Sequence, residues 1–293
     1  MVMTGVVVKA YGDYYSVQTN QKVILCTVKG RMKQERFTLV VGDQVDYKVT
    51  GEGKGIIEKI HPRTSLLKRP LVANISQVVV TFACCNPDYS LDLIDRFLVL
   101  VESSALQPIL CFNKVDLADR DEMEAVAEIY RRIGYKVFFT DAKSEAGISE
   151  LRALLDGEIT VFSGPSGAGK STLLNAIESG LLLKTGQVSD KIGRGRHTTR
   201  HAELLPLKSG GFVVDTPGFS FTEITLPEDT VKTCFPEFYE LPQACKFSSC
   251  LHDKEPQCQV KEAVAQGRIS SSRYENYVTI LHEAQANKKG YGK

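Results

Sequence analysis

The chain has 293 residues, enough for two or three domains that each bury a core. Its 36 Lys and Arg nearly balance its 35 Asp and Glu, so any contact with nucleic acid must come from local basic patches. No apolar run reaches transmembrane length and the amino terminus lacks a signal-peptide core, which predicts a cytoplasmic protein and excludes a membrane protein. In that compartment the eight cysteines are expected as thiols or metal ligands, not as disulfides.

The first part of the chain, residues 1–62, shows short strand patterns separated by glycine turns. The expected strands cover residues 4–10, 14–19, 23–28, 44–49 and 55–60. Gly12-Asp13 between the first two is a hairpin signal. Five short strands with glycine turns favour a small closed barrel, and the OB-fold is the commonest barrel of that kind.

One loop of this barrel region is basic, and it carries Lys29, Arg31, Lys33 and Arg36. On an OB-fold barrel such a loop is suited to bind an RNA phosphate backbone. The same residues also fit an ordinary solvated loop, and both interpretations stay open.

Beyond a connector that contains proline and basic residues, the pattern changes to alternating strands and helices. Strands are expected at residues 75–83, 108–112, 136–140, 159–162 and 212–214, and helices at 91–101, 122–133 and 148–155. This alternation predicts a parallel sheet covered by helices, with ligands at the carboxyl ends of the strands. We expect this α/β domain to span residues 63–221.

The motif Asn113-Lys114-Val115-Asp116 follows one of these strands and has the N-K-x-D pattern. A carboxylate at Asp116 accepts hydrogen bonds from the N1–H and the exocyclic amine of guanine, a pair of donors that adenine lacks. Asn113 and Lys114 are expected to brace the loop and to stack along the base. The motif therefore predicts a preference for GTP over ATP.

A second motif, Thr140-Asp141-Ala142-Lys143, follows the next strand. GTPases usually carry S-A-K at this place, where the loop backbone also contacts guanine. We therefore expect Asp141, Ala142 and Lys143 to bind the nucleotide, although Asp141 replaces the usual serine.

The most specific motif is a P-loop with the spacing G-x-x-x-x-G-K-S, placed between an apolar strand and a helical pattern. Its glycines let backbone N–H groups point at phosphate oxygens, and the helix N-terminus adds a partial positive charge. Lys170 is expected to reach the β- and γ-phosphates, and the Ser171 hydroxyl to ligate Mg²⁺. The predicted nucleotide-binding residues here are Gly164, Pro165, Ser166, Gly167, Ala168, Gly169, Lys170, Ser171 and Thr172.

The remaining magnesium ligands are expected in two later segments. Asp215 begins an Asp-Thr-Pro-Gly motif after a strand, so it is suited to hold Mg²⁺ through water while the Gly218 N–H senses the γ-phosphate. The basic loop at 193–201 contains two threonines, of which Thr199 is the expected Mg²⁺ ligand and Thr198 the alternative.

The residue that positions the attacking water is not the usual one. Many GTPases place Gln just after D-x-x-G, whereas this chain has Phe219, which cannot polarise water. Gly167 takes the position of the Asn in potassium-dependent GTPases, which argues against K⁺. We expect slow turnover until a partner orders the basic loop, with His197 positioning the water and Lys170 and Thr199 completing the catalytic set. In the alternative interpretation, His197 contacts RNA.

The last part of the chain, residues 222–293, contains Cys245, Cys250, His252 and Cys258. Three thiolates and one imidazole form a tetrahedral set with no open position, which predicts one structural Zn²⁺ in a mainly helical module. Helices are expected at 262–266 and 274–286. Arg268 and Arg273 are expected at the surface, where they contact RNA or keep the module soluble.

The order of the motifs is informative, because the base-reading motifs precede the P-loop although GTPases usually have the reverse order. The sequence therefore predicts a circularly permuted GTPase domain. With the barrel, the G-R-G-R-H-T-T-R loop and the Cys₃His set, nearly the whole chain resembles the family called ribosome small subunit-dependent GTPase A (RsgA, also YjeQ or YloQ). The resemblance implies GTP hydrolysis to GDP and phosphate, stimulated by the 30S subunit, a role in late small-subunit maturation, contact with 16S rRNA, and the same four zinc ligands.

The leading interpretation is thus a monomeric, Mg²⁺-dependent GTPase that binds neither DNA nor membranes. Its three domains would be an OB-fold barrel at 1–62, a permuted GTPase domain at 63–221 and a zinc-binding module at 222–293. One alternative is a non-catalytic RNA-binding protein with GTP as a structural ligand, which the missing Gln favours. Another is a P-loop ATPase or small-molecule kinase, which predicts competition by ATP.

Overall fold

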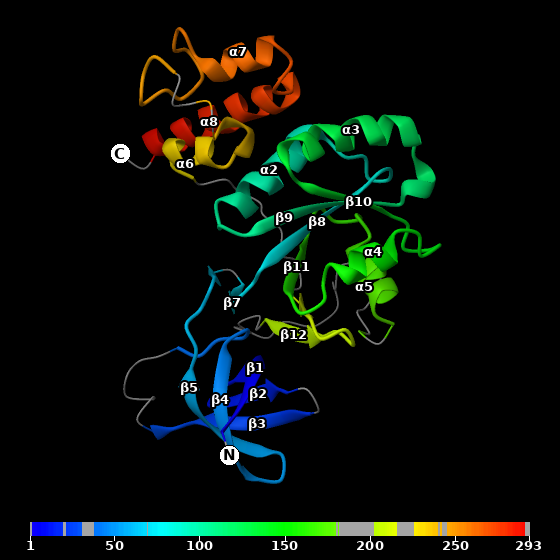
Figure 1. The fold of residues 1–293 in the computed structure, drawn as a ribbon, viewed down its shortest axis with the longest axis vertical. Helices are drawn as coiled ribbons and strands as arrows, with labels where there is room; N and C mark the ends of the chain where they lie inside the picture. Colours follow the sequence, from blue (N-terminus) through cyan, green and yellow to red (C-terminus); the bar gives the residue numbers. More distant parts are fainter. Residues whose placement is uncertain are drawn as a thin grey trace. The chain divides into compact units, whose positions relative to one another are not determined.

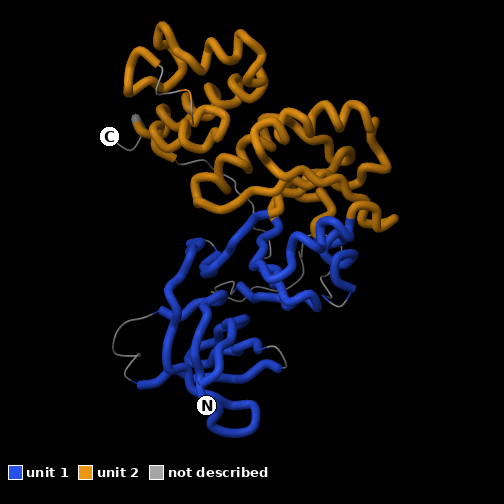
Figure 2. Tube along the Cα trace, in the orientation of Figure 1, with its two compact units in different colours: residues 1–78, 148–162, 171–219 blue, residues 79–147, 163–170, 220–293 orange. Residues whose placement is uncertain are grey.

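The computed structural model of the chain describes residues 2–19, 22–30, 38–68, 70–179, 181, 202–215, 226–239, 241 and 245–290. The chain forms two compact units, each assembled from segments far apart in the sequence (Figure 2). The first unit consists of residues 1–78, 148–162 and 171–219, and the second of residues 79–147, 163–170 and 220–293. Among the described helices, none combines the length and the apolar character needed to cross a bilayer.

The first unit contains a closed barrel of five strands (Figure 1). They close in the order β1-β2-β3-β5-β4, with β3 and β5 parallel and all other neighbours antiparallel. Alternate residues face inward, so that Val17, Ile24 and Cys26 are fully buried. The predicted OB-fold barrel is confirmed, and its strands are β1 (Val2–Tyr11), β2 (Tyr14–Gln18), β3 (Val23–Val28), β4 (Gln44–Gly51) and β5 (Lys54–Ile60).

A hairpin and a buried ion pair fix the segment that leaves the barrel. β6 (Leu66–Lys68) and β7 (Leu71–Ala73) pair antiparallel within the stretch that the sequence predicts only as a connector. Arg63 donates to both carboxylate oxygens of the fully buried Asp43, from Nε at 2.6 Å and from Nη2 at 2.8 Å. Because a two-pronged guanidinium–carboxylate pair has one preferred geometry, it holds the connector against the barrel.

The other strands of the first unit lie in the order β11-β13-β12 and are β11 (Ile159–Ser163), β12 (Glu203–Pro206) and β13 (Phe212–Asp215). β11 and β13 are parallel, whereas β12 is antiparallel to β13. Two helices, α4 (Ile148–Ala153) and α5 (Lys170–Ile177), accompany these strands. Arg152 of α4 donates to the carbonyls of Ala176 and Ile177, which satisfies acceptors that the end of α5 leaves open.

In the second unit, strands and helices alternate as predicted. The strands lie in the order β10-β9-β8, with β9 and β10 parallel. Ser90 and Asp119 are the N-caps of the helices at Leu91–Glu102 and Arg120–Ile133, since each side chain accepts a hydrogen bond from a backbone N–H of the first turn. The elements are β8 (Gln77–Ala83), α2 (Leu91–Glu102), β9 (Gln107–Asn113), η1 (Val115–Leu117), α3 (Arg120–Ile133) and β10 (Lys136–Thr140).

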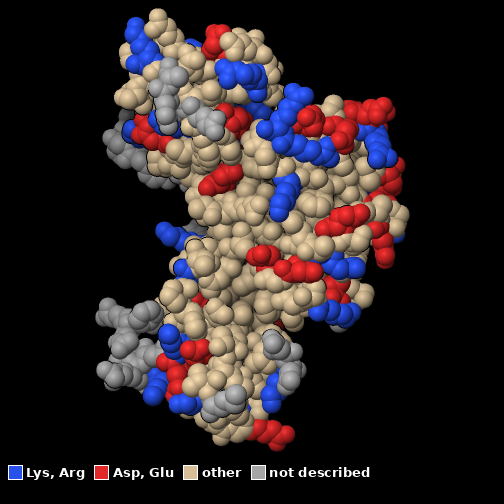
Figure 3. All heavy atoms as spheres, viewed as in Figure 1, with Lys and Arg blue, Asp and Glu red and all other residues tan. Residues whose placement is uncertain are grey.

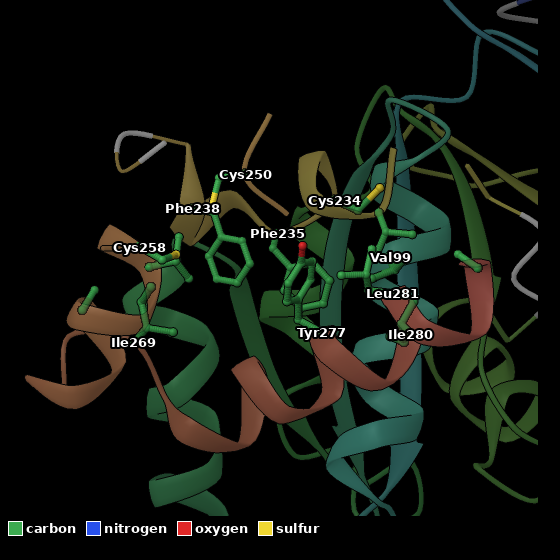
Figure 4. Close-up of a cluster of buried hydrophobic side chains, with 14 residues drawn as sticks. Val99, Cys234, Phe235, Phe238, Cys250, Cys258, Ile269, Tyr277, Ile280 and Leu281 are labelled. Atoms are coloured by element: carbon green, nitrogen blue, oxygen red, sulfur yellow. The ribbon is translucent and has the colours of Figure 1, made fainter. Parts of the chain in front are cut away.

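The C-terminal part of the second unit is a small helical module, and both helices predicted there are present. It consists of α6 (Glu228–Thr233), η2 (Pro236–Phe238), α7 (Gln259–Ala265) and α8 (Ser271–Gly290). Figure 4 shows its core, in which the rings of Phe235, Phe238 and Tyr277 meet at centroid distances of 5.0 to 5.4 Å. Val99 of α2 belongs to the same cluster, so the module packs directly on α2.

Arg273 of α8 is buried in this contact, and the prediction that it lies at the surface is wrong. Its guanidinium donates to Asp95 of α2 at 2.7 Å and to both carboxylate oxygens of Glu237 at 2.8 and 3.0 Å. Asp95 also accepts hydrogen bonds from Tyr130 of α3 and from Asn276 of α8. The cation is buried because two carboxylates neutralise it, and the network fixes the module on α2 and α3.

We expect Asp95→Ala to lower the free energy of unfolding by about 3–5 kcal/mol, because it leaves the Arg273 charge and two further donors short of a buried acceptor. Urea denaturation measures the change. Glu283→Ala is the matched control, since it breaks an ion pair between the same two helices, that of Glu283 with Arg96, at a more exposed place. We expect the control to cost less than about 1 kcal/mol. Equal losses would contradict a special role of the buried network.

Candidate nucleotide site and metal centre

The P-loop runs from the end of β11 into the first turn of α5, as the sequence predicts. Gly164 and Gly169 both have positive φ, 133° and 88°. A Cβ at Gly164 would collide with the carbonyl of Thr81, and one at Gly169 would collide with the amide of Asn113. Glycine is therefore required at both positions by the close approach of other parts of the chain, besides its role in exposing backbone N–H groups.

Lys170 is the first residue of α5, and its ammonium lies over the loop that precedes it. Nζ donates to the carbonyls of Gly164 at 2.7 Å and Pro165 at 2.8 Å. Burial lowers the pKa of Lys170. A partly desolvated cation whose acceptors here are neutral carbonyl groups is suited to exchange them for phosphate oxygens.

Asn113 joins the P-loop to both base-reading motifs. Its Nδ2 donates to the carbonyl of Ala168 in the P-loop at 3.0 Å. Its Oδ1 accepts from the Thr140 hydroxyl at 3.2 Å and from the Ala142 N–H at 3.3 Å. One buried amide thus holds together three segments that the chain visits in the order N-K-x-D, T-D-A-K, P-loop.

The other N-K-x-D residues lie beside Asn113 at the end of β9. Lys114 has a left-handed backbone, with φ of 61°, and its Nζ donates to the carbonyl of Asn86. Val115 begins the short helix η1, and Asp116 follows it with an exposed side chain. The exposed carboxylate is free to accept hydrogen bonds from the edge of a purine ring.

Asp141 is buried, and its carboxylate serves its own loop. It accepts from the backbone N–H groups of Lys143 at 3.0 Å and Ser144 at 3.1 Å. The hydrogen bonds from Ser144 and Lys143 also lower the pKa of Asp141. Asp141 thus shapes the turn that carries Ala142 and Lys143, which the match to S-A-K does not reveal.

The segment that follows β8 also reaches the P-loop, although its residues are not among those predicted from the sequence. Asn86 accepts the hydrogen bond from Lys114, and a Cβ at Gly167 would lie 3.0 Å from Pro87. The position of this segment could have indicated its role, because it begins at the carboxyl end of a strand in the predicted parallel sheet, where ligands bind.

For the other predicted residues, the structure shows the element in which each lies or does not describe them. Pro165, Ser166, Gly167 and Ala168 form the P-loop, Ser171 and Thr172 lie in the first turn of α5, and Asp215 ends β13. Lys29 is exposed just after β3, and its Nζ lies 3.9 Å from Oε1 of Glu58. Arg31, Lys33, Arg36, His197, Thr198, Thr199 and Gly218 lie outside the described residues.

The cysteine and histidine cluster forms a compact donor set. The Sγ atoms of Cys245, Cys250 and Cys258 and a ring nitrogen of His252 all lie within 4.8 Å of one another. The Nδ1 of His252 is 3.3 Å from the Sγ of Cys258 and 3.8 Å from that of Cys245. Tetrahedral bonds of zinc length would separate sulfur from nitrogen by about 3.6 Å and sulfur from sulfur by about 3.8 Å. The four side chains therefore fit one metal ion.

The surroundings of the cluster keep its histidine in the metal-binding form and supply hydrogen-bond donors to its sulfurs. Burial, and after it the charge of Lys232, lowers the pKa of His252, which keeps the imidazole neutral as a ligand must be. Backbone N–H groups of His252 and Gln259 donate to the sulfurs of Cys250 and Cys245, each at 3.4 Å. All eight cysteines are free.

Comparison with known proteins identifies the family. The model of the RsgA GTPase matches residues 60–225, more than half of the chain, and the model of the RsgA N-terminal domain matches residues 4–57. The chain belongs to the RsgA GTPase family. The small ribosomal subunit biogenesis GTPase RsgA of Clostridium perfringens (strain SM101 / Type A) is 46% identical over 289 residues, which cover 98% of this chain and 100% of that protein.

Solved structures similar to this RsgA family member share its fold. YjeQ from Thermotoga maritima matches with a TM-score of 0.85 and 39% identity, over 97% of this chain and 99% of that chain. YloQ, described as a circularly permuted GTPase, matches with a TM-score of 0.84 and 38% identity, over 98% of this chain and 96% of that chain. The predicted family, the permuted GTPase fold and the assignment as a GTP hydrolase are confirmed.

Proposed function

We propose that this chain hydrolyses GTP to GDP and phosphate on the 30S ribosomal subunit during late maturation, and that the subunit stimulates the reaction. The observation that carries the proposal is the position of Asn113, which joins the phosphate-binding loop to the base-reading motifs. A relative of 46% identity named as a small ribosomal subunit biogenesis GTPase supports the partner.

The phosphates are bound by groups around the P-loop. Backbone N–H groups of residues 164–169 and the ammonium of Lys170 bind the β- and γ-phosphate oxygens, where charge develops during transfer. Ser171, Thr199 and Asp215 hold Mg²⁺, which neutralises phosphate charge when bound. His197 positions the attacking water, and Gly218 responds to the γ-phosphate.

The flanking parts hold the protein on the subunit. The Cys₃His set would hold one structural Zn²⁺, since its four donors lie close enough together to occupy all four positions of a tetrahedral ion. The barrel contacts 16S rRNA, with Lys29, Arg31, Lys33 and Arg36 on its phosphates. The protein acts as a monomer in the cytoplasm, with domains at 1–62, 63–221 and 222–293.

Phosphate release from GTP, measured with and without 30S subunits, tests the proposal. We expect slow turnover by the protein alone and a large increase on adding subunits. A protein that binds GTP but releases no phosphate under either condition would instead be the non-catalytic RNA-binding alternative.

We expect Asp116→Asn to weaken GTP binding by on the order of 100-fold or more and to favour xanthosine triphosphate, because an amide pairs with the C2 carbonyl of xanthine instead of the amine of guanine. Competition titrations with labelled nucleotide measure both affinities. Asp119→Asn is the matched control, since Asn also caps α3 and leaves the base-reading motif intact. Unchanged nucleotide preference in Asp116→Asn would remove its assigned role.

A further inference from the structure

His252 is held differently from most histidines that bind a metal. Its Nδ1 faces the sulfur atoms of Cys258 and Cys245, so Nδ1 is the nitrogen that would bind the ion. A metal-binding histidine usually donates its other ring N–H to a carboxylate, a carbonyl or a water molecule, and this hydrogen bond orients the ring. Within the described part of the chain, the buried Nε2 of His252 has no such partner. The ring must therefore be oriented in another way.

The backbone of His252 has a conformation that few residues with a Cβ adopt. Its φ is 60°, in the left-handed region. The His252 N–H donates to Sγ of Cys250 at 3.4 Å, and the imidazole packs edge-to-face on Phe238 with the ring centroids 5.7 Å apart. A backbone in this region persists only where the contacts around it hold it there. The contacts of the neighbouring residues are therefore informative.

Glu255 supplies two of these contacts. Its Oε1 accepts a hydrogen bond from the Leu251 N–H at 2.8 Å, and its Oε2 accepts one from the Asp253 N–H at 3.0 Å. Because these two residues flank His252, one carboxylate ties together the backbone on both sides of the predicted ligand. Hydrogen bonds to an ionised acceptor are roughly twice as strong as those between neutral groups, which suits them to hold a strained backbone.

Carbonyl groups of the same loop are bound by side chains of the two helices that follow it. Tyr274 of α8 donates to the carbonyl of His252 at 2.8 Å, and Lys261 of α7 donates to that of Asp253 at 3.0 Å. The helices therefore fix the carbonyl groups of the loop, whereas Glu255 fixes its N–H groups.

The charge of Glu255 alone would not indicate this role. Figure 3 shows Asp and Glu side chains interspersed with Lys and Arg on the visible face of the C-terminal helical module. An acidic residue on such a surface ordinarily serves only solubility. Glu255 differs because it is partly buried and both of its oxygens accept hydrogen bonds from backbone N–H groups.

We propose that Glu255 is the positioning residue of the metal centre, whose carboxylate holds residues 251–253 so that Nδ1 of His252 points at the three sulfur atoms. It takes the place of the carboxylate that usually binds the second ring nitrogen of a metal-binding histidine. Glu255 does not bind the ion itself, since the four donors already complete a tetrahedral set. The inference rests on the metal centre of the proposed function and is independent of how GTP is hydrolysed.

The test titrates the full chain, freed of bound metal, with Co²⁺, which takes tetrahedral sites as Zn²⁺ does and absorbs visible light. Displacement of the bound Co²⁺ by Zn²⁺ then gives the affinity for Zn²⁺. We expect Glu255→Ala to bind one ion per chain, with an affinity for Zn²⁺ reduced about 10- to 100-fold, the effect of losing a group that orients a metal ligand. The absorption of each bound Co²⁺ should also fall, because a poorly oriented His252 lets water distort the tetrahedral site.

A second variant, Glu255→Gln, keeps the shape of the side chain and removes its charge. The amide oxygen can accept from one of the two N–H groups, whereas the amide NH₂ faces the other. We therefore expect a loss of affinity smaller than that of Glu255→Ala. Glu262→Ala is the matched control, since Glu262 is an exposed acidic residue of α7 that accepts a hydrogen bond from Gln266 at 2.7 Å. It should bind both ions as the unchanged protein does.

Val231→Ala separates positioning of the ligand from stability of the module. Val231 is fully buried in the core of the module and does not belong to the metal-binding loop, so its truncation lowers stability without touching the donors. This variant should weaken metal binding only through the folding of the module. The absorption of each bound Co²⁺ should stay that of the unchanged protein, which distinguishes Val231→Ala from Glu255→Ala.

Three outcomes would overturn the inference. The first is that both Glu255 variants bind Zn²⁺ as tightly as Glu262→Ala does. The second is weaker binding by Glu255→Ala with the Co²⁺ spectrum of the unchanged protein, and the third is an equal change of that spectrum in Glu255→Ala and Val231→Ala. Failure of the unchanged protein to bind either ion would instead refute the metal centre of the proposed function, so the two failures are distinguishable.

Discussion

Lys170→Ala is expected to lower kcat/KM for GTP hydrolysis by about 10²–10³-fold, both in the protein alone and with 30S subunits. The ammonium lies at the start of α5 and over the carbonyls of Gly164 and Pro165, where the phosphates of a bound nucleotide would replace those acceptors. Charge accumulates on these phosphates in the transition state, so the lost interaction affects the rate as well as the binding of GTP. Phosphate release at saturating and at limiting GTP separates the two effects.

Lys208→Ala is the matched control for Lys170→Ala. Lys208 is a lysine whose side chain is 80% exposed and pairs with Glu178 at the surface. Its removal should leave turnover unchanged and cost less than about 1 kcal/mol of stability. If Lys170→Ala kept more than about a tenth of the turnover of the unchanged protein, the P-loop would not act as proposed.

Cys258→Ser is expected to abolish stoichiometric metal binding and to unfold much of the C-terminal module. The four donors lie within 4.8 Å of one another, and removing one leaves an incomplete set for a tetrahedral ion. Metal binding contributes on the order of 10 kcal/mol to the folding of small zinc modules. Metal analysis by mass spectrometry gives the stoichiometry, and hydrogen exchange over residues 226–290 reports the unfolding.

Cys234→Ala is the control for that experiment, because Cys234 is a buried thiol of the same module outside the donor set. Its Sγ donates to the carbonyl of Thr230 at 3.2 Å, so its loss should cost about 1 kcal/mol and leave one metal ion per chain. Treating the unchanged protein with a strong chelator should reproduce the exchange pattern of Cys258→Ser. If the module stayed protected from hydrogen exchange after chelation, its packing on α2 would suffice for folding without the metal.

Much of the nucleotide site could be predicted from the sequence because its motifs are local. The spacing of the P-loop glycines and Lys170 is fixed by covalent geometry, and the same holds for N-K-x-D at the end of a strand. The Cys₃His set was predictable for the same reason, since all four ligands lie within fourteen residues. Local patterns of this kind indicate the same chemistry whatever the fold of the rest of the chain.

Arg273 shows where such reasoning fails. An arginine in a polar segment is usually exposed, and only the fold reveals that Asp95, 178 residues earlier in the chain, lies 2.7 Å from its guanidinium. Asp141 is a second case, because the match to S-A-K does not show that its carboxylate accepts hydrogen bonds from its own loop. In both, the partner of a side chain decides its role, and the partner is set by packing.

The sequence by itself determined which chemical groups this protein carries and in which order: a barrel, base-reading motifs, a P-loop and a metal set. Only the tertiary structure decided that Asn113 joins the P-loop to the motifs that precede it and that Arg273 anchors the metal module. The physical reason is that composition and spacing are properties of the chain, whereas hydrogen-bond partners and shared faces depend on how distant segments pack.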